Sequence, residues 1–247
     1  MDNNGGALLT VELDMEFYRL VLHHYPATRS VRVRWMLHET VGENFEVRRV
    51  DLYEGAQFRA EYLALNPHHN VPMLEIHWED GSIQPMLESA AIVEWLAEQF
   101  PEKALAPPVG ASRDRTEYLQ YLHYGATWMD MMLWQIRAHK HILPAEDADQ
   151  KTIARYEKKF RDECEPHLAR RLEQGDYVLG NAFSSCDVIL GHNVFWARGY
   201  GLCEGEIFSR YLERLMARPG FQRALDDLGD FSIKPASDSP IRKKFTG

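Results

Sequence analysis

Short apolar segments of two different periodicities alternate along the first hundred residues. Where apolar and polar residues alternate, as in residues 45–52, the pattern predicts a half-buried strand. Where apolar residues recur every three or four positions, as in residues 89–100, it predicts a helix. Residues 17–24 are rich in β-forming residues and end before Pro26, so they predict the first strand. The other predicted elements, in chain order, are helix 32–39, strand 45–52, helix 58–65, strands 71–78 and 83–87, and helix 89–100.

The last two of these strands are separated by a strong turn signal, Glu79-Asp80-Gly81-Ser82, and predict a hairpin. Pro85 has no backbone N–H to donate to a neighbouring strand, so its strand is expected at the edge of the sheet. The resulting order, βαβαββα, predicts one compact α/β unit of about eighty residues.

The pattern changes after residue 100. Prolines and a glycine within residues 101–111 mark a linker, and no convincing strand follows it. Two adjacent apolar stripes run along residues 118–136 at helical spacing, and later segments are also amphipathic. We therefore expect an all-helical domain over residues 112–230. A flexible extension is expected over residues 1–16 and a flexible tail over residues 231–247. The further helices are predicted at 151–172, 187–198, 208–217 and from 221.

Composition and charge narrow the class of protein. The chain is 45% hydrophobic and 26% charged, as globular proteins are, and its net charge of -9 is spread without a block of like charges. An acidic surface argues against nucleic-acid binding, which needs a basic patch. The three cysteines form no CxxC pair and fit a reducing compartment. Neither a signal peptide nor a membrane-spanning apolar run is seen, so a cytoplasmic protein is expected.

Pro72 opens a predicted strand directly after the loop Asn66-Pro67-His68-His69-Asn70. A proline in this position favours a cis peptide bond in a tight turn. The backbone N–H and C=O of Val71 would then face outward and could pair with an extended peptide. The alternative is a trans proline that only begins the strand.

Glu88 and Ser89 stand at a predicted strand-to-helix junction, where Ser89 suits the N-cap position. A helix N-terminus with a free hydroxyl can bind a ligand carboxylate, and a neighbouring carboxylate can hold an ammonium group. Together they suit the α-amino-acid end of a γ-glutamyl peptide. The alternative is an ordinary helix cap next to an exposed acid.

The spacing of these two segments, with a hairpin between them, resembles the thioredoxin-like half of cytosolic glutathione transferases. The resemblance extends over roughly residues 17–228, because Ser184-Ser185-Cys186-Asp187 resembles that family's helical capping motif and Arg218-Pro219-Gly220-Phe221 its late-helix signature. In physical terms, Ser184 and Asp187 can form a capping box. The resemblance implies the glutathione transferase fold: an α/β thioredoxin-like N-terminal domain over residues 17–100, followed by an all-α C-terminal domain.

The same resemblance implies roles for individual residues. Val71 would pair its backbone with the cysteinyl part of glutathione beside cis-Pro72, and Glu88 and Ser89 would hold the γ-glutamyl end. His69 stands where many members have a glycine. It could contact the glycyl carboxylate or simply face solvent.

The residue that activates the thiol is expected in the turn after the first strand. The string beginning Thr28-Arg29-Ser30 resembles a bacterial and fungal subgroup with a Ser-Arg pair here. Thr28 would donate to the thiolate and Arg29 would add positive charge, with Ser30 and Tyr25 as alternatives. Such donors and charges lower a thiol pKa from its free value of about 8.5. The absence of cysteine from this loop argues against thiol–disulfide and dehydroascorbate reductase activities.

The resemblance also suggests an electrophile pocket lined by Tyr25, Tyr121, Tyr124 and Trp128, although an aromatic stripe at this spacing is otherwise bundle core. The pairs His23-His24 and His68-His69 could converge at one sheet end, but no acidic or cysteine ligand is spaced with them, and we expect no metal site.

The combined expectation is a cytoplasmic homodimer that attacks a hydrophobic electrophile with the thiolate of glutathione, its co-substrate. The alternatives are a non-catalytic glutathione or ligand carrier, and a glutathione-dependent peroxidase or lyase on the same scaffold.

Overall fold

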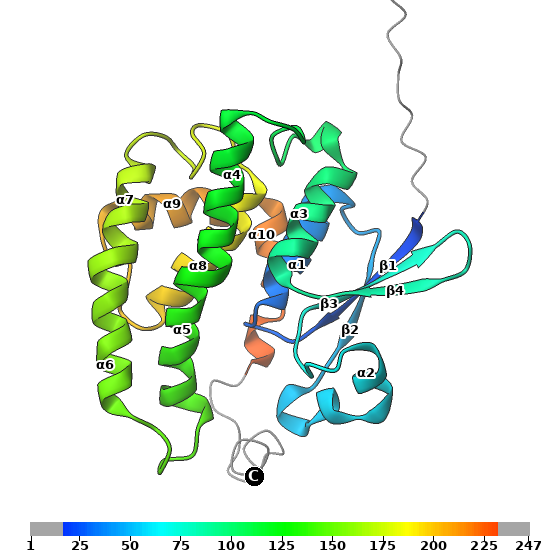
Figure 1. Ribbon diagram of the computed structural model, residues 1–247, viewed down its shortest axis with the longest axis horizontal. Helices are drawn as coiled ribbons and strands as arrows, with labels where there is room; N and C mark the ends of the chain where they lie inside the picture. The colour runs from blue at the N-terminus through cyan, green and yellow to red at the C-terminus, as the bar shows by residue number, and fades with distance from the viewer. Residues whose placement is uncertain (1–16, 232–247) are drawn as a thin grey trace, which may run out of the picture.

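The computed structural model describes residues 17–231 (Figure 1). The predicted extension 1–16 and all of the predicted tail except Phe231 lie outside these described residues. The first domain has the predicted βαβαββα order. Its elements are β1 (Phe17–His24), α1 (Ser30–Thr40), β2 (Glu46–Arg49), the short turns η1 (Leu52–Glu54) and η2 (Ala56–Phe58), α2 (Ala60–Leu65), β3 (Met73–Trp78), β4 (Ile83–Met86) and α3 (Ser89–Gln99).

The four strands form one mixed sheet in the order β2-β1-β3-β4. β1 is parallel to β2 and antiparallel to β3, and β3 is antiparallel to β4. β4, which contains Pro85, lies at the edge, as its missing N–H predicted. β2 is shorter than the predicted strand 45–52 and its four residues are all exposed. The prediction of a half-buried strand was wrong there because β2 forms the other edge, and only Val50 after it is buried.

Alternation along β1 and β3 separates two apolar clusters. Leu20 and Leu22 of β1, with Leu74 and Ile76 of β3, belong to the large core that continues into α1, α3 and the helical domain. Met73 belongs instead to a small cluster with α2 on the other side of the sheet. α1 and α3 therefore lie between the sheet and the helical domain (Figure 1). The first residues of α1 are thereby fixed between the two domains.

Helices are the regular elements of the second domain in its described residues, as predicted, apart from one isolated β-bridge between Tyr177 and Gly180. A single long helix runs through α4, η4 and α5, and a second one through α6, η6 and α7, with π-helical turns inside each. The elements are η3 (Pro101–Lys103), α4 (Arg113–Tyr124), η4 (Gly125–Met129), α5 (Asp130–Arg137), η5 (Ala138–Ile142), α6 (Gln150–Lys159), η6 (Phe160–Cys164), α7 (Glu165–Leu172), α8 (Ser185–Arg198), α9 (Glu206–Met216), α10 (Pro219–Ala224) and η7 (Leu228–Asp230).

The predicted capping box at the start of α8 is present. One carboxylate oxygen of Asp187 accepts hydrogen bonds from the backbone N–H and hydroxyl of Ser184, at 2.9 and 3.0 Å. The other accepts from the N–H of Val178 and the hydroxyl of Tyr211, both at 2.9 Å. Asp187 is fully buried, so these bonds satisfy a carboxylate that could not otherwise be buried. The motif is structural, as the sequence indicated.

The late-helix motif joins α10 to α1. The Phe221 ring packs perpendicular to Trp35, with ring centroids 4.9 Å apart, and Arg218 donates two hydrogen bonds to Glu39. A Cβ at Gly220 would come within 2.8 Å of the Glu39 carboxylate, so a larger residue here would displace the Glu39 side chain that Arg218 holds. Within residues 17–231 no helix combines the length and apolar character that crossing a bilayer requires.

Candidate functional site

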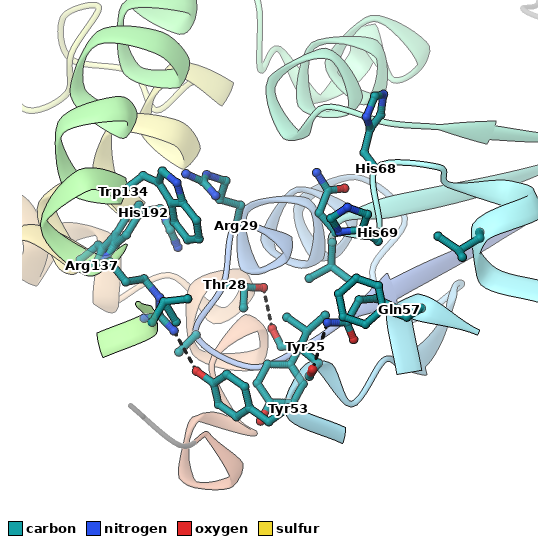
Figure 2. Close-up of a pocket in the computed structure, with 18 residues that line it drawn as sticks. Tyr25, Thr28, Arg29, Tyr53, Gln57, His68, His69, Trp134, Arg137 and His192 are labelled. Atoms are coloured by element: carbon teal, nitrogen blue, oxygen red, sulfur yellow. Dashed lines mark hydrogen bonds between the residues drawn. The ribbon is translucent and has the colours of Figure 1, made fainter. Parts of the chain in front are cut away.

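A cavity of about 670 Å³ lies between the two domains (Figure 2). The thioredoxin-like domain contributes the loop after β1, the segment around η1 and η2, and the loop before β3. The helical domain contributes residues of α5, η5 and α8. The lining side chains are Tyr25, Ala27, Thr28, Arg29, Leu52, Tyr53, Gln57, Phe58, Leu63, His68, His69, Asn70, Val71, Trp134, Arg137, Ile142, His192 and Trp196.

Thr28 lies in the middle of this cavity, at the N-terminal end of α1 (Figure 2). Its hydroxyl donates to the backbone carbonyl of Tyr25 at 2.8 Å and is also 2.8 Å from the Ser30 hydroxyl. Ser30 is fully buried and does not line the cavity. Of the two hydroxyls that the sequence offered as thiol donors, Thr28 is therefore the one that a ligand in the cavity can reach.

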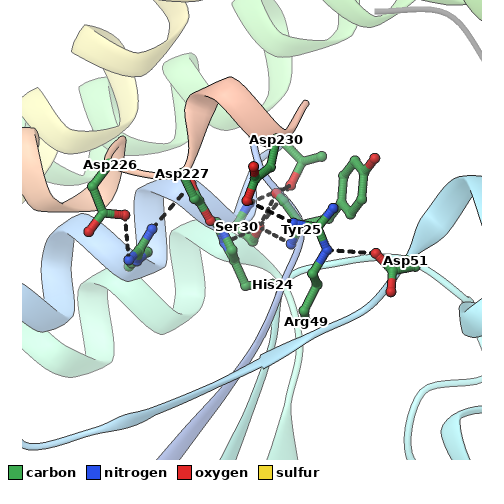
Figure 3. A network of polar contacts seen from close by, with 10 residues as sticks. His24, Tyr25, Ser30, Arg49, Asp51, Asp226, Asp227 and Asp230 are labelled. Carbon is green, nitrogen blue, oxygen red and sulfur yellow. Dashed lines mark hydrogen bonds and ion pairs between the residues drawn. The ribbon is translucent and has the colours of Figure 1, made fainter. Parts of the chain in front are cut away.

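The Ser30 hydroxyl, 2.8 Å from that of Thr28, begins a hydrogen-bonded series that continues through His24 to Asp227 (Figure 3). The Ser30 hydroxyl is 2.8 Å from Nδ1 of His24, and Nε2 of His24 is 3.0 Å from the Asp227 carboxylate. Burial tends to raise the pKa of Asp227, but the hydrogen bond from His24 and the charge of Arg34 outweigh it and lower that pKa. Asp227 is thus an ionised acceptor. His24 therefore donates to Asp227 from Nε2. The Ser30 hydroxyl lies within hydrogen-bonding distance of Nδ1 of His24 and also donates to the Tyr25 carbonyl at 3.1 Å.

Arg29 is directed across the domain interface to α5. Its Nε is 2.9 Å from both carboxylate oxygens of Asp130, and its Nη2 is 2.5 Å from one of them. The guanidinium also lies over the rings of Trp134 and Trp196, at 5.0 and 5.6 Å. Arg29 lines the cavity, and it shares the single carboxylate of Asp130 with Arg32.

Arg32 is a buried hub that the sequence analysis missed. Its guanidinium donates to Asp130 at 2.7 Å, to Asn193 at 2.5 Å, to Nδ1 of His192 at 3.1 Å and to the Ser89 hydroxyl at 3.2 Å. Burial would raise the pKa of Asp130, but Arg32 and Arg29 lower it to about 2. A signal existed in the sequence, because Asp130 is an acid inside the apolar run from Met129 to Leu133.

His192 connects this cluster to Thr28. Burial and the adjacent Arg32 charge hold the pKa of His192 well below its usual value, and a hydrogen bond to the backbone of Thr28 acts in the opposite direction. His192 is therefore neutral, so it accepts a proton at Nδ1 from Arg32. The helical domain thus fixes the backbone of the Thr28 loop as well as the side chain of Arg29.

Val71 lines the same cavity, and the Val71–Pro72 peptide bond is cis, as the sequence predicted. The preceding loop is fixed at Asn70, whose carbonyl accepts from the Tyr62 hydroxyl at 2.5 Å and from the Asn66 amide at 2.9 Å. The cavity therefore brings together a hydroxyl on one loop and a cis-proline segment on another, separated by forty residues of sequence or more.

This arrangement is matched by known proteins. Residues 28–99 match the family model described as the N-terminal domain of glutathione S-transferase. The chain belongs to the glutathione S-transferase family.

Two curated relatives match most of the chain, and a third matches a shorter part of it. A glutathione S-transferase of Escherichia coli O157:H7 is 28% identical over 214 residues, which are 84% of this chain and 98% of that protein. A disulfide-bond oxidoreductase of Escherichia coli K12 is 26% identical and spans 85% of this chain and 96% of the relative. A maleylacetoacetate isomerase of Pseudomonas aeruginosa is 35% identical over a shorter match, 37% of this chain and 43% of that protein.

Solved structures show the same fold. A glutathione transferase of Burkholderia graminis, with two glutathione molecules bound per subunit, superposes with a TM-score of 0.73 at 26% identity and covers 84% of this chain and 88% of its own. A transferase homologue from Sulfitobacter with bound glutathione gives a TM-score of 0.69 at 25% identity, covering 86% of this chain and 99% of its own. The thioredoxin-like domain with a four-stranded mixed sheet and the helical domain are therefore those of this family.

The γ-glutamyl residues expected from the glutathione S-transferase resemblance differ in detail from the prediction. Glu88, not Ser89, occupies the N-cap position of α3, with φ 68°, and no side chain caps the helix. Ser89 is the first helical residue and is buried, with its hydroxyl accepting from Arg32. Neither residue nor Pro72 is among the lining residues of the cavity. The N-cap assignment was wrong by one residue because Glu88 adopts the positive φ that ends the preceding loop.

The pairs His23-His24 and His68-His69 do not come together. His69 is exposed, lines the cavity and packs its ring 5.0 Å from that of Phe58. His23 bonds Glu75 at 2.6 Å and His24 bonds Ser30, so neither converges with His68 and His69. Among residues 17–231, no group of three or more His, Cys, Asp or Glu side chains is arranged to hold a metal ion.

Three of the four predicted pocket aromatics lie outside the cavity. Tyr25 lines it, but Tyr121 and Tyr124 pack against the His167 ring of α7, at 5.6 and 4.9 Å. Trp128 is 41% exposed and lies under the Lys159 ammonium. The long helix α4-η4-α5 directs these three residues toward α6 and α7. Its following turns direct Trp134 and Arg137 into the cavity. Periodicity identified the wide apolar face, but it did not show which part of that face reaches the first domain.

The cysteines take no part in the cavity. Cys164, Cys186 and Cys203 are all buried and unpaired. Burial raises the pKa of Cys164 to about 11, which keeps it a thiol. Any thiol chemistry in the cavity therefore has to come from a ligand.

Proposed function

We propose that this protein is a glutathione transferase in which Thr28 activates the thiol of glutathione for attack on a hydrophobic electrophile. The observation that carries this proposal is the position of the Thr28 hydroxyl, in the cavity beside the cis-proline segment at Val71. The solved relatives that bind glutathione support glutathione as the co-substrate.

In this proposal the backbone of Val71 pairs with the cysteinyl residue, and the Glu88-Ser89 junction holds the γ-glutamyl end. His69 and Gln57, which line the wall next to Val71, are placed to meet the glycyl end. Because the Val71 backbone is already fixed, pairing with it positions the glutathione sulfur while the protein loses little conformational entropy.

Thr28 then lowers the pKa of the bound thiol. Its proton is shared between the Tyr25 carbonyl and Ser30 in the ligand-free protein, and it turns to the thiolate when glutathione binds. A hydrogen bond to a charged acceptor contributes about 1.5–3 kcal/mol, which corresponds to a pKa decrease of about one to two units. The N-terminal end of α1 adds a favourable dipole.

The thiolate attacks the electrophilic carbon of the second substrate, forms a carbon–sulfur bond, and the leaving group departs with the electron pair. Trp134, Trp196 and Ile142 provide apolar walls that hold this substrate and exclude water. Burial of both reactants in one cavity is the main source of rate, together with the lowered thiol pKa.

Titration of the ultraviolet thiolate absorbance of bound glutathione tests the proposal. The wild-type pKa is expected to lie one to two units below the free value of about 8.5. Thr28→Ala should return it towards that value, Thr28→Ser should restore the wild-type value, and both should still bind glutathione. A wild-type pKa equal to the solution value would instead favour a glutathione or ligand carrier.

A second candidate function is glutathione-dependent disulfide reduction, because the disulfide-bond oxidoreductase relative spans 85% of this chain. With every protein cysteine buried, both thiols would have to come from glutathione. Turnover of a small disulfide that exceeds turnover of every electrophile tested would favour this function.

We also propose that the protein acts as a cytoplasmic homodimer in detoxification. The glutathione S-transferase family resemblance supports the dimer, and three unpaired cysteines support a reducing compartment. Light scattering coupled to size exclusion tests the dimer: a mass of one chain would contradict it.

A further inference from the structure

The cavity contains two arginine side chains but no acidic ones. Its lining residues include Arg29 and Arg137, and no Asp or Glu is among those that the structure describes. Arg29 is bonded from behind to Asp130, a carboxylate that it shares with Arg32. Arg137 differs, because within residues 17–231 no carboxylate pairs with it. Its partners are the Tyr53 hydroxyl, which accepts from Nη2 at 3.1 Å, and the Phe231 ring, 5.1 Å away.

Arg137 lies on the side of the cavity where the electrophile would meet the proposed thiolate. It ends α5 and enters the cavity from the helical domain together with Trp134, whereas Gln57 and His69 enter from the opposite wall (Figure 2). Thr28 lies between the two walls. A glutathione molecule paired with Val71 would therefore leave Arg137 facing the second substrate.

Tyr53 and Phe231 hold the guanidinium in a defined orientation. Tyr53 belongs to η1 of the first domain, so the Arg137–Tyr53 hydrogen bond closes the lower rim of the cavity across the domain interface (Figure 2). Neither partner neutralises the charge, because a phenol and a phenyl ring are both uncharged. A guanidinium held in this way presents its remaining N–H groups for bidentate pairing with a carboxylate.

We propose that Arg137 binds a carboxylate on the electrophile, and that the substrate class is an apolar, aromatic-sized electrophile with one negative charge. This inference rests on the proposed transferase function. The apolar walls accept the body of the substrate, and Arg137 fixes its charged end. With the carboxylate fixed at Arg137, the reacting carbon is held towards Thr28.

The first test compares two matched electrophiles, 4-chloro-3-nitrobenzoate and 4-chloro-3-nitrobenzamide, each rate being divided by its uncatalysed rate with glutathione. In the wild type kcat/KM should favour the benzoate by about tenfold, the effect of one charge-assisted hydrogen-bond pair. Arg137→Gln should abolish this preference, and Arg137→Lys should retain part of it. The KM for glutathione should not change.

Lys140→Gln is the matched control. It removes a positive charge one helical turn from Arg137, but that ammonium is already paired with Glu157 at 2.6 Å and does not line the cavity. The benzoate preference should persist in this variant. If Lys140→Gln also abolished the benzoate preference, the preference would come from the overall positive charge of this helix and not from Arg137. That result would overturn the proposal.

A binding measurement separates this inference from the transferase proposal. Unreactive 4-nitrobenzoate and 4-nitrobenzamide are titrated calorimetrically into protein saturated with S-methylglutathione. About tenfold tighter benzoate binding, lost in Arg137→Gln, supports the anion site even if no electrophile is turned over, in which case only the transferase proposal falls. Equal binding in the wild type overturns the anion site. So does an Arg137→Gln effect confined to glutathione affinity, since Arg137 would then hold the glycyl carboxylate.

Discussion

The Ser30 hydroxyl lies 2.8 Å from Nδ1 of His24, behind the loop that carries Thr28. Ser30 was an alternative thiol donor on sequence grounds, but its burial gives it a different position in the same hydrogen-bonded series. The Ser30 hydroxyl lies within hydrogen-bonding distance of His24, of the Tyr25 carbonyl and of the Thr28 hydroxyl. Through Ser30 and His24, the Thr28 hydroxyl is thus linked to the carboxylate of Asp227.

Removal of that carboxylate should therefore change thiol activation. In Asp227→Ala, His24 is no longer held as an Nε2 donor, so the proton positions along Ser30 and Thr28 become mixed. We expect the pKa of bound glutathione to rise by roughly half a unit, less than in Thr28→Ala, as partial loss of a hydrogen-bond network would give. Ultraviolet titration measures it. Unchanged thiol pKa together with lower stability would show that Asp227 is only structural. Asp226→Ala, at the adjacent and more exposed carboxylate, is the control.

Asp130 should contribute strongly to stability. Asp130→Ala leaves Arg32, which is 1% exposed, without its carboxylate. Breaking a buried pair in this way costs about 3–5 kcal/mol in the free energy of unfolding. Urea unfolding at neutral pH measures it. Arg29→Met, which removes the more exposed of the two arginines, should cost less, and an equal cost would contradict the assignment of Arg32 as the hub.

The same carboxylate predicts an acid limit. The folded pKa of Asp130 is about 2, below the ordinary value of 3.8, because Arg32 and Arg29 outweigh its burial. A depressed folded pKa gives stability that is complete above the unfolded pKa and is lost as the pH falls through the folded one. Stability from this site should thus decline between about pH 4 and pH 2. Thermal unfolding across this range should show a smaller decline in Asp130→Asn than in the wild type.

Asp187 should affect folding without affecting the chemistry. Asp187→Ala removes the acceptor of four buried donors, the N–H and hydroxyl of Ser184, the N–H of Val178 and the Tyr211 hydroxyl. At about 1 kcal/mol for each unsatisfied donor, the loss should be about 4 kcal/mol. Chemical denaturation measures it. The KM for glutathione of the folded variant should match the wild type, and a large change would contradict a purely structural role.

Two tryptophans on one continuous helix provide a test of the pocket assignment. Trp134→Ala removes a wall of the cavity and should raise the KM for an aromatic electrophile about tenfold, as loss of a large buried contact does. Trp128→Ala removes a partly exposed ring under Lys159 and should leave this KM unchanged. Steady-state kinetics at saturating glutathione distinguish them. The reverse result would restore the pocket expected from the sequence.

The sequence predicted the elements whose formation depends on nearby residues. β1 was predicted with its observed bounds, and Pro85 correctly indicated an edge strand, because both follow from local chemistry. The capping box of Ser184 and Asp187 followed from a four-residue pattern. The exposure of β2 was not predictable in the same way, because alternation shows which side chains share a face but not whether another element covers that face.

The parts of the site that the sequence did not show are those that join distant segments. Arg32 and Asp130 are separated by 98 positions, and no periodicity relates an arginine in one helix to an acid in another. The choice of Trp134 over Trp128 as the pocket wall likewise depends on which helical turn reaches the first domain. The position of Thr28 at the cavity followed from the loop in which it lies, and its role as thiol donor stays a prediction.

The bond between His24 and Asp227 spans 203 positions of the chain, and it has a consequence for synthesis. A ribosome that has produced only the thioredoxin-like domain has made Thr28 and Val71, but not Asp130, His192 or Asp227. The nascent domain therefore has Ser30 and His24 behind the Thr28 loop, but not the carboxylate that holds His24. In the proposed function, the hydrogen-bonded series behind Thr28 would be complete only when nearly the whole polypeptide has emerged.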